Sequence, residues 1–234
     1  MHEIPYIGDE LTLFQHATNW KSYYGRLLKP YIKKKVLEVG AGMGGTTAFL
    51  CDGNQEEWVC LEPDPALFEE LQKKINDKNL PPCCTAIKGT TGDLAGRQFD
   101  TVLYIDVIEH IEQDGEELNR AWSLLTPGGS LIVLVPANQY FYSPFDQAIG
   151  HYRRYNKKRL LAVEPEGMEL KKITYLDAMG YFASAVNKFF LKQKYPTPQQ
   201  IGFWDKKLIR LSKLIDPAIG HLVGKTLIAV WEKK

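Results

Sequence analysis

Residues 35–47 constrain the fold more than any other part of this 234-residue chain. Val36, Leu37 and Val39 predict a buried strand, because a strand covered on both faces reads as a short apolar run. Gly40, Gly42 and Gly44 follow at once, and glycine allows left-handed backbone and close approach of a ligand. The segment therefore predicts a strand, a tight turn and a helix that together cradle a nucleotide-containing cofactor.

The glycine spacing alone fits two cofactor classes. It satisfies both G-x-G-x-x-G, which is typical of dinucleotide sites, and the shorter G-x-G-x-G of S-adenosylmethionine (SAM) sites. Glu38 favours SAM, because a carboxylate at the mouth of the first strand would repel a pyrophosphate. It would instead face the ammonium and sulfonium of SAM, directly or through water. The alternative interpretation pairs Glu38 with Lys33 or Lys34.

Length and composition predict one α/β domain over residues 1–234. The chain is 44% hydrophobic and 24% charged, which is ordinary for a globular protein with a sizeable core. Its formal net charge of +1 gives no global field that would gather nucleic acid. No segment approaches the roughly 20 apolar residues of a membrane span, and the start does not resemble a secretion signal. We therefore expect a cytoplasmic chain without a transmembrane segment.

Apolar patterns predict a regular alternation of helices and strands. Residues 10–30 show helical spacing and are expected to form most of an N-terminal helical cap over residues 1–30. Asp64 before Pro65 predicts the N-cap of a helix, and residues 114–117 predict a capping box. The strands are expected at residues 36–39, 58–61, 85–88, 99–105, 130–135, 168–176 and 225–231. Further helices are expected at residues 178–191 and 204–215.

An irregular, aromatic-rich stretch follows the fifth expected strand. Residues 136–156 are too long for a simple connection, which is typical of a lid or a substrate wall. Within it, residues 151–155 combine a titratable ring, two guanidinium groups and two aromatic rings. We interpret this stretch as the part of the chain that contacts a substrate.

The chain resembles the class I SAM-dependent methyltransferases in three blocks, residues 36–44, 99–111 and 124–136, which occur in that family's order. The resemblance implies a Rossmann-like, doubly wound α/β fold with seven strands in the order 3-2-1-4-5-7-6, of which only strand 7 is antiparallel. It also implies SAM as cofactor, bound where strands 1 and 4 end. The Gly-His-x-Arg-Arg-Tyr segment at residues 150–155 is similar to one found in a bacterial small-molecule methyltransferase-like subgroup.

The resemblance also implies roles for individual residues. Glu62, at the end of the second strand, would accept both ribose hydroxyls, while Asp64 is assigned to helix capping. The adenine is expected near residues 89–91, with Asp93 as a further possibility, and Asp106 beside the methionine end. The expected cofactor-binding residues are Glu38, Gly40, Ala41, Gly42, Gly44, Glu62, Pro63, Thr90, Thr91, Asp106 and Val107.

The acceptor side is less constrained. If the acceptor is a hydroxyl, His110 or His151 is expected to remove its proton, because imidazole titrates near neutrality. A forked guanidinium next to aromatic rings suits an anionic acceptor with an apolar part. The expected substrate-binding residues are Tyr142, Arg153, Arg154 and Tyr155. In the alternative interpretation one arginine pairs with Asp146 and the aromatic rings pack as a lid. No metal ligand is assigned.

We therefore expect a SAM-dependent methyltransferase that acts on an oxygen of a small molecule and not on nucleic acid. The oligomeric state stays open. One alternative is a metal-dependent RNA 2′-O-methyltransferase, because residues 106–110 with His151 resemble its Glu-x-x-Glu-His and distant His; the first position here is Asp. Another is a SAM-binding protein without turnover. A nicotinamide oxidoreductase is disfavoured by Glu38 and by the Pro-Gly-Gly block at residues 127–129.

Overall fold

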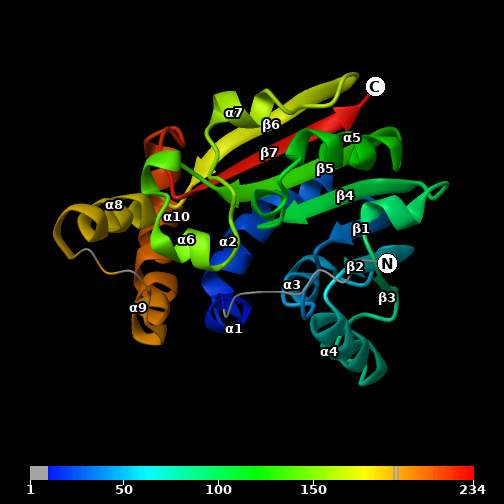
Figure 1. Cartoon of the computed structure of the whole chain (residues 1–234), viewed down its shortest axis with the longest axis horizontal. Coiled ribbons are helices and arrows are strands. Elements are labelled where there is room, and N and C mark those ends of the chain that lie inside the picture. The colour runs from blue at the N-terminus through cyan, green and yellow to red at the C-terminus, as the bar shows by residue number, and fades with distance from the viewer. Residues whose placement is uncertain (1–9, 192, 194) are drawn as a thin grey trace.

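A seven-stranded mixed sheet forms the centre of the molecule (Figure 1). The computed structural model describes residues 10–191, 193 and 195–234. The strands are β1 (Lys35–Val39), β2 (Glu57–Glu62), β3 (Cys84–Lys88), β4 (Phe99–Ile105), β5 (Leu125–Pro136), β6 (Met168–Leu176) and β7 (Thr226–Lys233). Their order is β3-β2-β1-β4-β5-β7-β6. β7 is antiparallel to both its neighbours, and the other pairs are parallel, which confirms the expected fold.

Helices connect the strands and cover the sheet. The α-helices are α1 (Glu10–Phe14), α2 (Thr18–Leu28), α3 (Thr47–Leu50), α4 (Pro65–Asn76), α5 (Asp114–Ser123), α6 (Pro144–Ala148), α7 (Lys157–Leu161), α8 (Ala178–Val186), α9 (Pro198–Phe203) and α10 (Ile209–Ala218). Helices α1 and α2 and the 3-10 turn that follows cover residues 10–14, 18–28 and 29–31 of the region predicted as a helical cap over residues 1–30, and residues 1–9 of that prediction lie outside the described residues. Short 3-10 segments include η1 (Lys29–Tyr31), η2 (Thr91–Leu94), η3 (Ile108–His110) and η4 (Gln139–Phe141).

Two apolar layers explain why the strands are almost continuously hydrophobic. Val36 and its sheet neighbour Trp58 pack into one layer, together with Tyr24 of α2 and Ile209 of α10. Alternate strand residues, such as Leu37, pack on the opposite face in a second layer that includes side chains of α5 and α7. Because both faces are covered, the strands lack the polar alternation of a half-exposed sheet.

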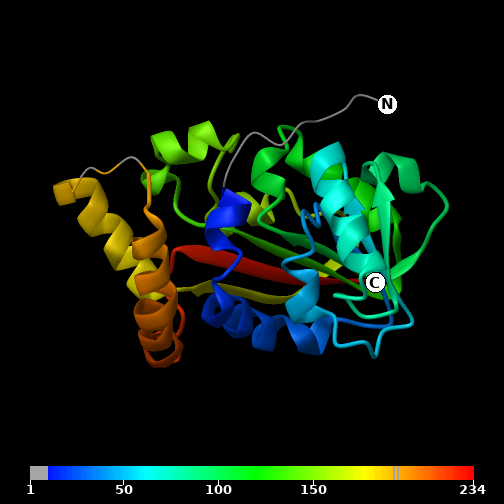
Figure 2. The same cartoon turned by 90° about the horizontal axis from the view of Figure 1, so that it is seen from below.

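An arm of helices, which comprises residues 178–191 and 198–203, projects beyond one end of the sheet (Figures 1 and 2). It consists of α8, the π-helical turn η5 (Asn187–Leu191) and α9, and a second π-helical turn, η6 (Trp204–Leu208), leads into α10. The sequence predicted α8 with η5 as one helix but missed α9, which Thr197 caps and Pro198 begins. It also missed α7, a five-residue helix capped by Asn156. In the described part of the chain no helix is long and apolar enough to cross a membrane.

The two predicted helix starts had different outcomes. Asp64 is confirmed as the N-cap of α4, where its side chain accepts a hydrogen bond of 2.9 Å from the backbone N–H of Leu67. The capping box at residues 114–117 is wrong, because the residue before α5 is Gln113 and it makes no side-chain cap. Glu117 is instead buried and accepts a 2.7 Å hydrogen bond from Tyr104. Glu117 therefore bonds Tyr104, which is distant in the sequence, and does not form the predicted capping box.

Candidate active site

A cavity of about 1230 Å³ lies where β1, β4 and β5 end. Its lining includes Gly40 and Ala41 after β1, Asp106 after β4, His151, and Phe182 of the arm. β1 pairs with both β2 and β4, so this is the place where the strand order reverses and where open α/β sheets bind ligands. The volume exceeds the roughly 300–1000 Å³ of a single ligand pocket. It is large enough for a cofactor and a second molecule.

The glycine turn has the conformation that its sequence predicts. Gly40, Gly42 and Gly44 have φ angles of 64°, 54° and 72°, which lie in the left-handed region. A β-carbon on Gly40 would lie 2.7 Å from Cγ2 of Val107, so this turn packs directly against the segment after β4. The backbone N–H of Ala41 donates to the carbonyl oxygen of Leu61 at 3.1 Å and fixes the turn to β2.

Glu38 lies behind the glycine turn rather than in the cavity. It is 2% exposed, and its Oε2 accepts hydrogen bonds from Thr47 Oγ1 at 2.7 Å and Trp58 Nε1 at 2.8 Å. Burial raises the pKa of Glu38 to about 7. Glu38 does not line the cavity, and its predicted contact with a bound cofactor, directly or through water, stays a prediction. The lysine alternative is wrong, because Lys33 pairs with Glu232 and Lys34 with Glu56.

Glu62 joins the glycine turn to the end of β2. Its Oε2 accepts from the backbone N–H of Gly42 at 2.7 Å, and its Oε1 accepts from that of Asp64 at 2.9 Å. Pro63, which lies between Glu62 and Asp64 in the sequence, is half-buried. Each carboxylate oxygen can accept a second hydrogen bond, so Glu62 keeps acceptor capacity for the hydroxyls of a ribose. That contact stays a prediction.

The two threonines expected near an adenine differ in what their hydroxyls do. Thr91 is buried, and its hydroxyl lies 3.0 Å from both carboxylate oxygens of Glu117. That hydroxyl is already bonded to Glu117, and the contact of Thr91 with the adenine stays a prediction. Thr90 is exposed and forms a capping box with Asp93 at the start of η2. Its contact with adenine stays a prediction.

Asp106 occupies an unusual backbone conformation on the cavity lining. Its φ angle is 55°, in the left-handed region that residues other than glycine seldom adopt, and its residue surface is exposed. Its backbone N–H donates to the carbonyl oxygen of Leu134 at 2.9 Å. Val107 packs against Gly40 and does not line the cavity. Strained residues of this kind cluster at ligand sites, which favours a binding role for Asp106.

Two lysines beside the glycine turn escaped the sequence analysis. Lys21 of α2 lies on the cavity lining and donates to the carbonyl oxygen of Gln15 at 3.1 Å. Burial and the neighbouring Lys74 lower the pKa of Lys21. Lys74 of α4 donates to the carbonyl oxygen of Met43 at 2.8 Å. Tertiary packing of α2 and α4 brings these cations together, so no local pattern in the sequence indicates them.

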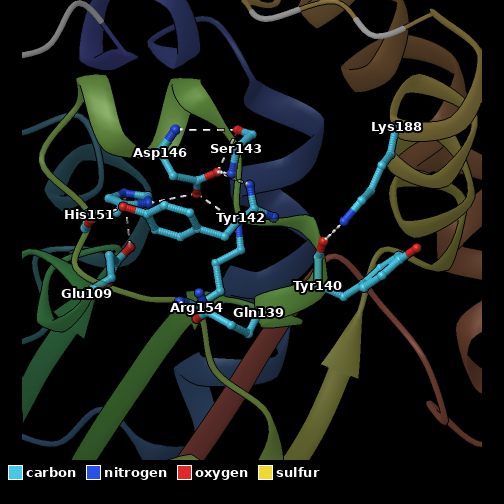
Figure 3. Close-up of polar contacts among 9 residues, drawn as sticks. All are labelled: Glu109, Gln139, Tyr140, Tyr142, Ser143, Asp146, His151, Arg154 and Lys188. Atoms are coloured by element: carbon cyan, nitrogen blue, oxygen red, sulfur yellow. Dashed lines mark hydrogen bonds and ion pairs between the residues drawn. The ribbon is translucent and has the colours of Figure 1, made fainter.

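Asp146 organises the middle of the site (Figure 3). It accepts from Arg154 Nε at 2.7 Å and Nη2 at 2.9 Å, and from Ser143 Oγ at 2.7 Å. Its Oδ1 lies 3.0 Å from Nδ1 of His151. Burial opposes the charge, but the hydrogen bonds from His151 and Arg154 hold the pKa of Asp146 well below its usual range. The pairing of one arginine with Asp146, which the alternative interpretation predicts, is therefore confirmed, whereas its packing of the aromatic rings as a lid stays a prediction.

Two of the four expected substrate-binding residues lie away from the cavity. Arg153 Nη1 pairs with Asp114 at 2.6 Å, and its Nη2 donates to the carbonyl oxygen of Glu112 at 2.7 Å. Tyr155 is fully buried and donates to the same Asp114 carboxylate at 2.7 Å. The structure thus corrects both assignments. Tyr142 and Arg154 do line the cavity, and Tyr142 donates to the carbonyl oxygen of His151 at 2.5 Å.

Both candidate bases line the cavity, but their surroundings differ. The rings of His110 and His151 meet edge to face, with centroids 4.5 Å apart. Burial and the neighbouring His151 lower the pKa of His110 to about 4, which makes it a weak base. His151 turns Nδ1 towards Asp146, and its Nε2 lies 3.9 Å from Glu109 Oε1. His151 therefore has the orientation expected of a proton acceptor.

Glu109 is the residue at this site that the sequence analysis undervalued. It is fully buried on the cavity lining, and among the described residues neither of its carboxylate oxygens has a hydrogen-bond partner. Burial and the carboxylate of Asp106 raise the pKa of Glu109 well above its usual value, and its own backbone N–H offsets this only in part. Its position next to His110 in the sequence gave no sign of this isolation.

Comparison with known proteins agrees with this architecture. Residues 37–131 match the family described as "Methyltransferase domain". The chain is 29% identical over 122 residues to a tRNA U34 carboxymethyltransferase of Syntrophotalea carbinolica, covering 50% of this chain and 38% of that protein. It is also 29% identical over 110 residues to a ubiquinone biosynthesis O-methyltransferase of Azorhizobium caulinodans, covering 46% of this chain and 42% of that protein. The chain therefore spans about two fifths of the curated relatives it matches.

A solved structure extends the similarity beyond the matched domain. Phosphoethanolamine N-methyltransferase 2 of Haemonchus contortus, in complex with SAM, superimposes with a TM-score of 0.62 at 13% identity. The match covers 94% of this chain and 56% of that one. At this identity the likeness concerns the fold.

Proposed function

We propose, from the premise that this chain is a class I SAM-dependent methyltransferase, that it transfers the methyl group to an oxygen of a small, anionic acceptor with an apolar part. One observation carries the proposal. A single cavity joins the glycine turn after β1 to His151 and to the aromatic side chains of the arm. Cofactor and acceptor can thus meet without crossing solvent.

The residues around the glycine turn fit the cofactor. When bound, SAM supplies an electrophilic methyl group on a sulfonium. Lys21 offers a cation for the methionine carboxylate, and burial already disfavours its charge in the absence of an anion. Asp106 offers a carboxylate for the ammonium group, and Glu62 has acceptor capacity left for the ribose. This chain's main task is to hold the reacting atoms in line.

The acceptor end combines cations with apolar surface. Half-buried Lys225 lines the cavity with its Nζ 5.1 Å from the centre of the Trp204 ring, and burial lowers its pKa, so an anion there would be favourable. Arg154 adds a second guanidinium, although Asp146 already balances it. Phe182 of α8 is 52% exposed and Phe203 of α9 is 58% exposed, and both line the cavity. These features support an anionic acceptor with an apolar body.

His151 is the residue best placed to take a proton from an acceptor hydroxyl. Its Nδ1 is bonded to Asp146, which orients the ring and stabilises the imidazolium that forms at Nε2. His151 would accept the hydroxyl proton as the acceptor oxygen takes the methyl group from the sulfonium. Asp146 does not touch the acceptor and acts as a positioning residue.

The test measures transfer of an isotopically labelled methyl group from SAM to a panel of phenols and carboxylic acids with and without apolar chains, and to RNA. We expect transfer to an anionic, partly apolar hydroxyl compound. His151→Ala should abolish turnover and retain SAM affinity by calorimetry, whereas the matched control His16→Ala, at an exposed position, should change neither.

Three results would overturn the proposal. Binding of NAD(P)H in place of SAM would contradict the cofactor assignment. SAM binding without transfer to any compound would favour a non-catalytic protein. Transfer to RNA alone would favour the nucleic-acid alternative.

A further inference from the structure

The carboxylate of Glu109 is the least satisfied polar group in the described part of the chain. Glu109 is 0% exposed, and both Oε1 and Oε2 lack a hydrogen-bond partner among the described residues. Asp106 adds a second carboxylate nearby. A buried carboxylate without hydrogen bonds is strongly unfavourable unless it takes up a proton or a positive charge completes the site, and the charge of Arg154 offsets the cost for Glu109 only in part.

Two imidazole rings lie around this carboxylate. Donor atoms of Glu109, His110 and His151 all lie within 4.8 Å of one another. Nε2 of His151 is 3.9 Å from Oε1 of Glu109, too far for a hydrogen bond but close enough to share an ion. The three residues come from two segments, η3 after β4 and the loop after α6, which the backbone hydrogen bond from Tyr152 N–H to the Glu109 carbonyl holds together.

We propose that Glu109, His110 and His151 bind a divalent transition-metal ion. Bonds of about 2.0–2.2 Å to imidazole nitrogen and carboxylate oxygen place two ligands at most about 4.4 Å apart, so small side-chain rotations complete the site. Two imidazoles with one carboxylate suit Mn²⁺, Fe²⁺, Co²⁺ or Zn²⁺, whereas Mg²⁺ and Ca²⁺ favour oxygen ligands alone.

Asp146 supplies the outer support that such a site requires. Metal-binding histidines usually donate their second ring nitrogen to a carboxylate or carbonyl, which fixes the ring. Here Nδ1 of His151 lies 3.0 Å from Asp146 Oδ1, leaving Nε2 for the ion. The ring of His151 is therefore oriented before any ion binds. A backbone interaction with Ile149 favours the charged form of the His110 ring.

The position of the ion assigns it a role in the proposed methyl transfer, and this role rests on the proposed function. Glu109, His110 and His151 all line the cavity, so the open coordination positions face the acceptor. There the ion would bind the acceptor oxygen and lower the pKa of its hydroxyl, and the proton would leave to water. His151 would then act as a ligand, and the ion would replace it in activating the acceptor.

The test uses the full chain after removal of metals with a chelator, and it requires neither SAM nor turnover. Co²⁺ is titrated while its visible absorption is recorded, and Mn²⁺ is titrated by calorimetry. We expect one ion per chain. Glu109→Gln and His110→Ala should each weaken binding at least tenfold, and Asp146→Asn about 10- to 100-fold through the ring of His151. His16→Ala and His221→Ala, outside the cluster, should bind as the wild type does.

The inference fails if neither ion binds, or if the cluster variants retain wild-type affinity while circular dichroism shows them folded. Glu109→Gln and His110→Ala change different side chains, so the test stays usable if one of the two variants does not fold. Turnover that persists in excess chelator, without ion binding, would overturn the inference and leave His151 as the base. Ion binding without methyl transfer to any acceptor would instead overturn the proposed function.

Discussion

Replacing Gly40 with alanine tests how the glycine turn is built. The residue has a φ angle of 64°, and an added β-carbon would lie 2.7 Å from Cγ2 and 3.1 Å from Cγ1 of Val107. Left-handed backbone costs alanine about 1 kcal/mol, and overpacking against a branched side chain costs about 1–3 kcal/mol more. We therefore expect Gly40→Ala to lower the free energy of unfolding by about 2–4 kcal/mol.

Gly96 provides a matched control for the backbone term. Its φ angle is 86°, but nothing in the described part of the structure lies within 4 Å of an added β-carbon. Gly96→Ala should therefore cost only about 1 kcal/mol. Val107→Ala removes the clashing methyl groups, so the double variant with Gly40→Ala should be more stable than the sum of the single changes by about 1–3 kcal/mol.

The assay is urea unfolding of the four variants and the wild type without added cofactor. The reasoning is refuted if Gly40→Ala loses no more stability than Gly96→Ala. It is refuted equally if the coupling between positions 40 and 107 is near zero.

Three further predictions follow from buried carboxylates. Because burial raises the pKa of Glu38 from 4.5 to about 7, the wild type should lose stability relative to Glu38→Gln as pH rises from 4.5 to 7, by on the order of 3 kcal/mol. Urea unfolding at both pH values checks this, and a pH-independent difference would contradict it. Asp146→Ala leaves the buried guanidinium of Arg154 without its carboxylate and should cost about 3–5 kcal/mol, whereas Asp146→Asn should cost less; equal losses in thermal unfolding would count against the ion pair. Glu62→Ala should weaken SAM binding about tenfold or more by calorimetry, and unchanged affinity would remove Glu62 from the ribose role.

The sheet was largely predictable because its signal is local and repeated. The predicted ranges for β4 and β6, residues 99–105 and 168–176, match the structure, since each is a run bounded by turn residues. The strand order came from the family resemblance and not from periodicity. The short helices were harder to predict, because α7 and α9 have five and six residues and show too few turns for a helical pattern.

The site was predictable in composition but not in arrangement. Arg153 and Arg154 are neighbours in the sequence, yet one binds Asp114 and the other binds Asp146 on the cavity side. In an irregular segment no periodicity tells which way each side chain points. The glycine motif indicated that Glu38 belongs to the site. Its hydrogen bonds with Thr47 and Trp58 depend on packing across the sheet, which the motif does not reveal. The isolation of Glu109 likewise arises only when η3 meets the loop after α6.

The place of β7 has a consequence for how this protein folds. β7 follows every other strand along the chain, yet it lies between β5 and β6, so β6 has no partner in the sheet until β7 arrives. During synthesis β1 to β5 can pair early, whereas β6 has no strand partner until the 49 residues between Leu176 and Thr226 have been added. Because such long-range pairing is slow, we expect the cofactor half to become protected from hydrogen exchange before the edge formed by β6.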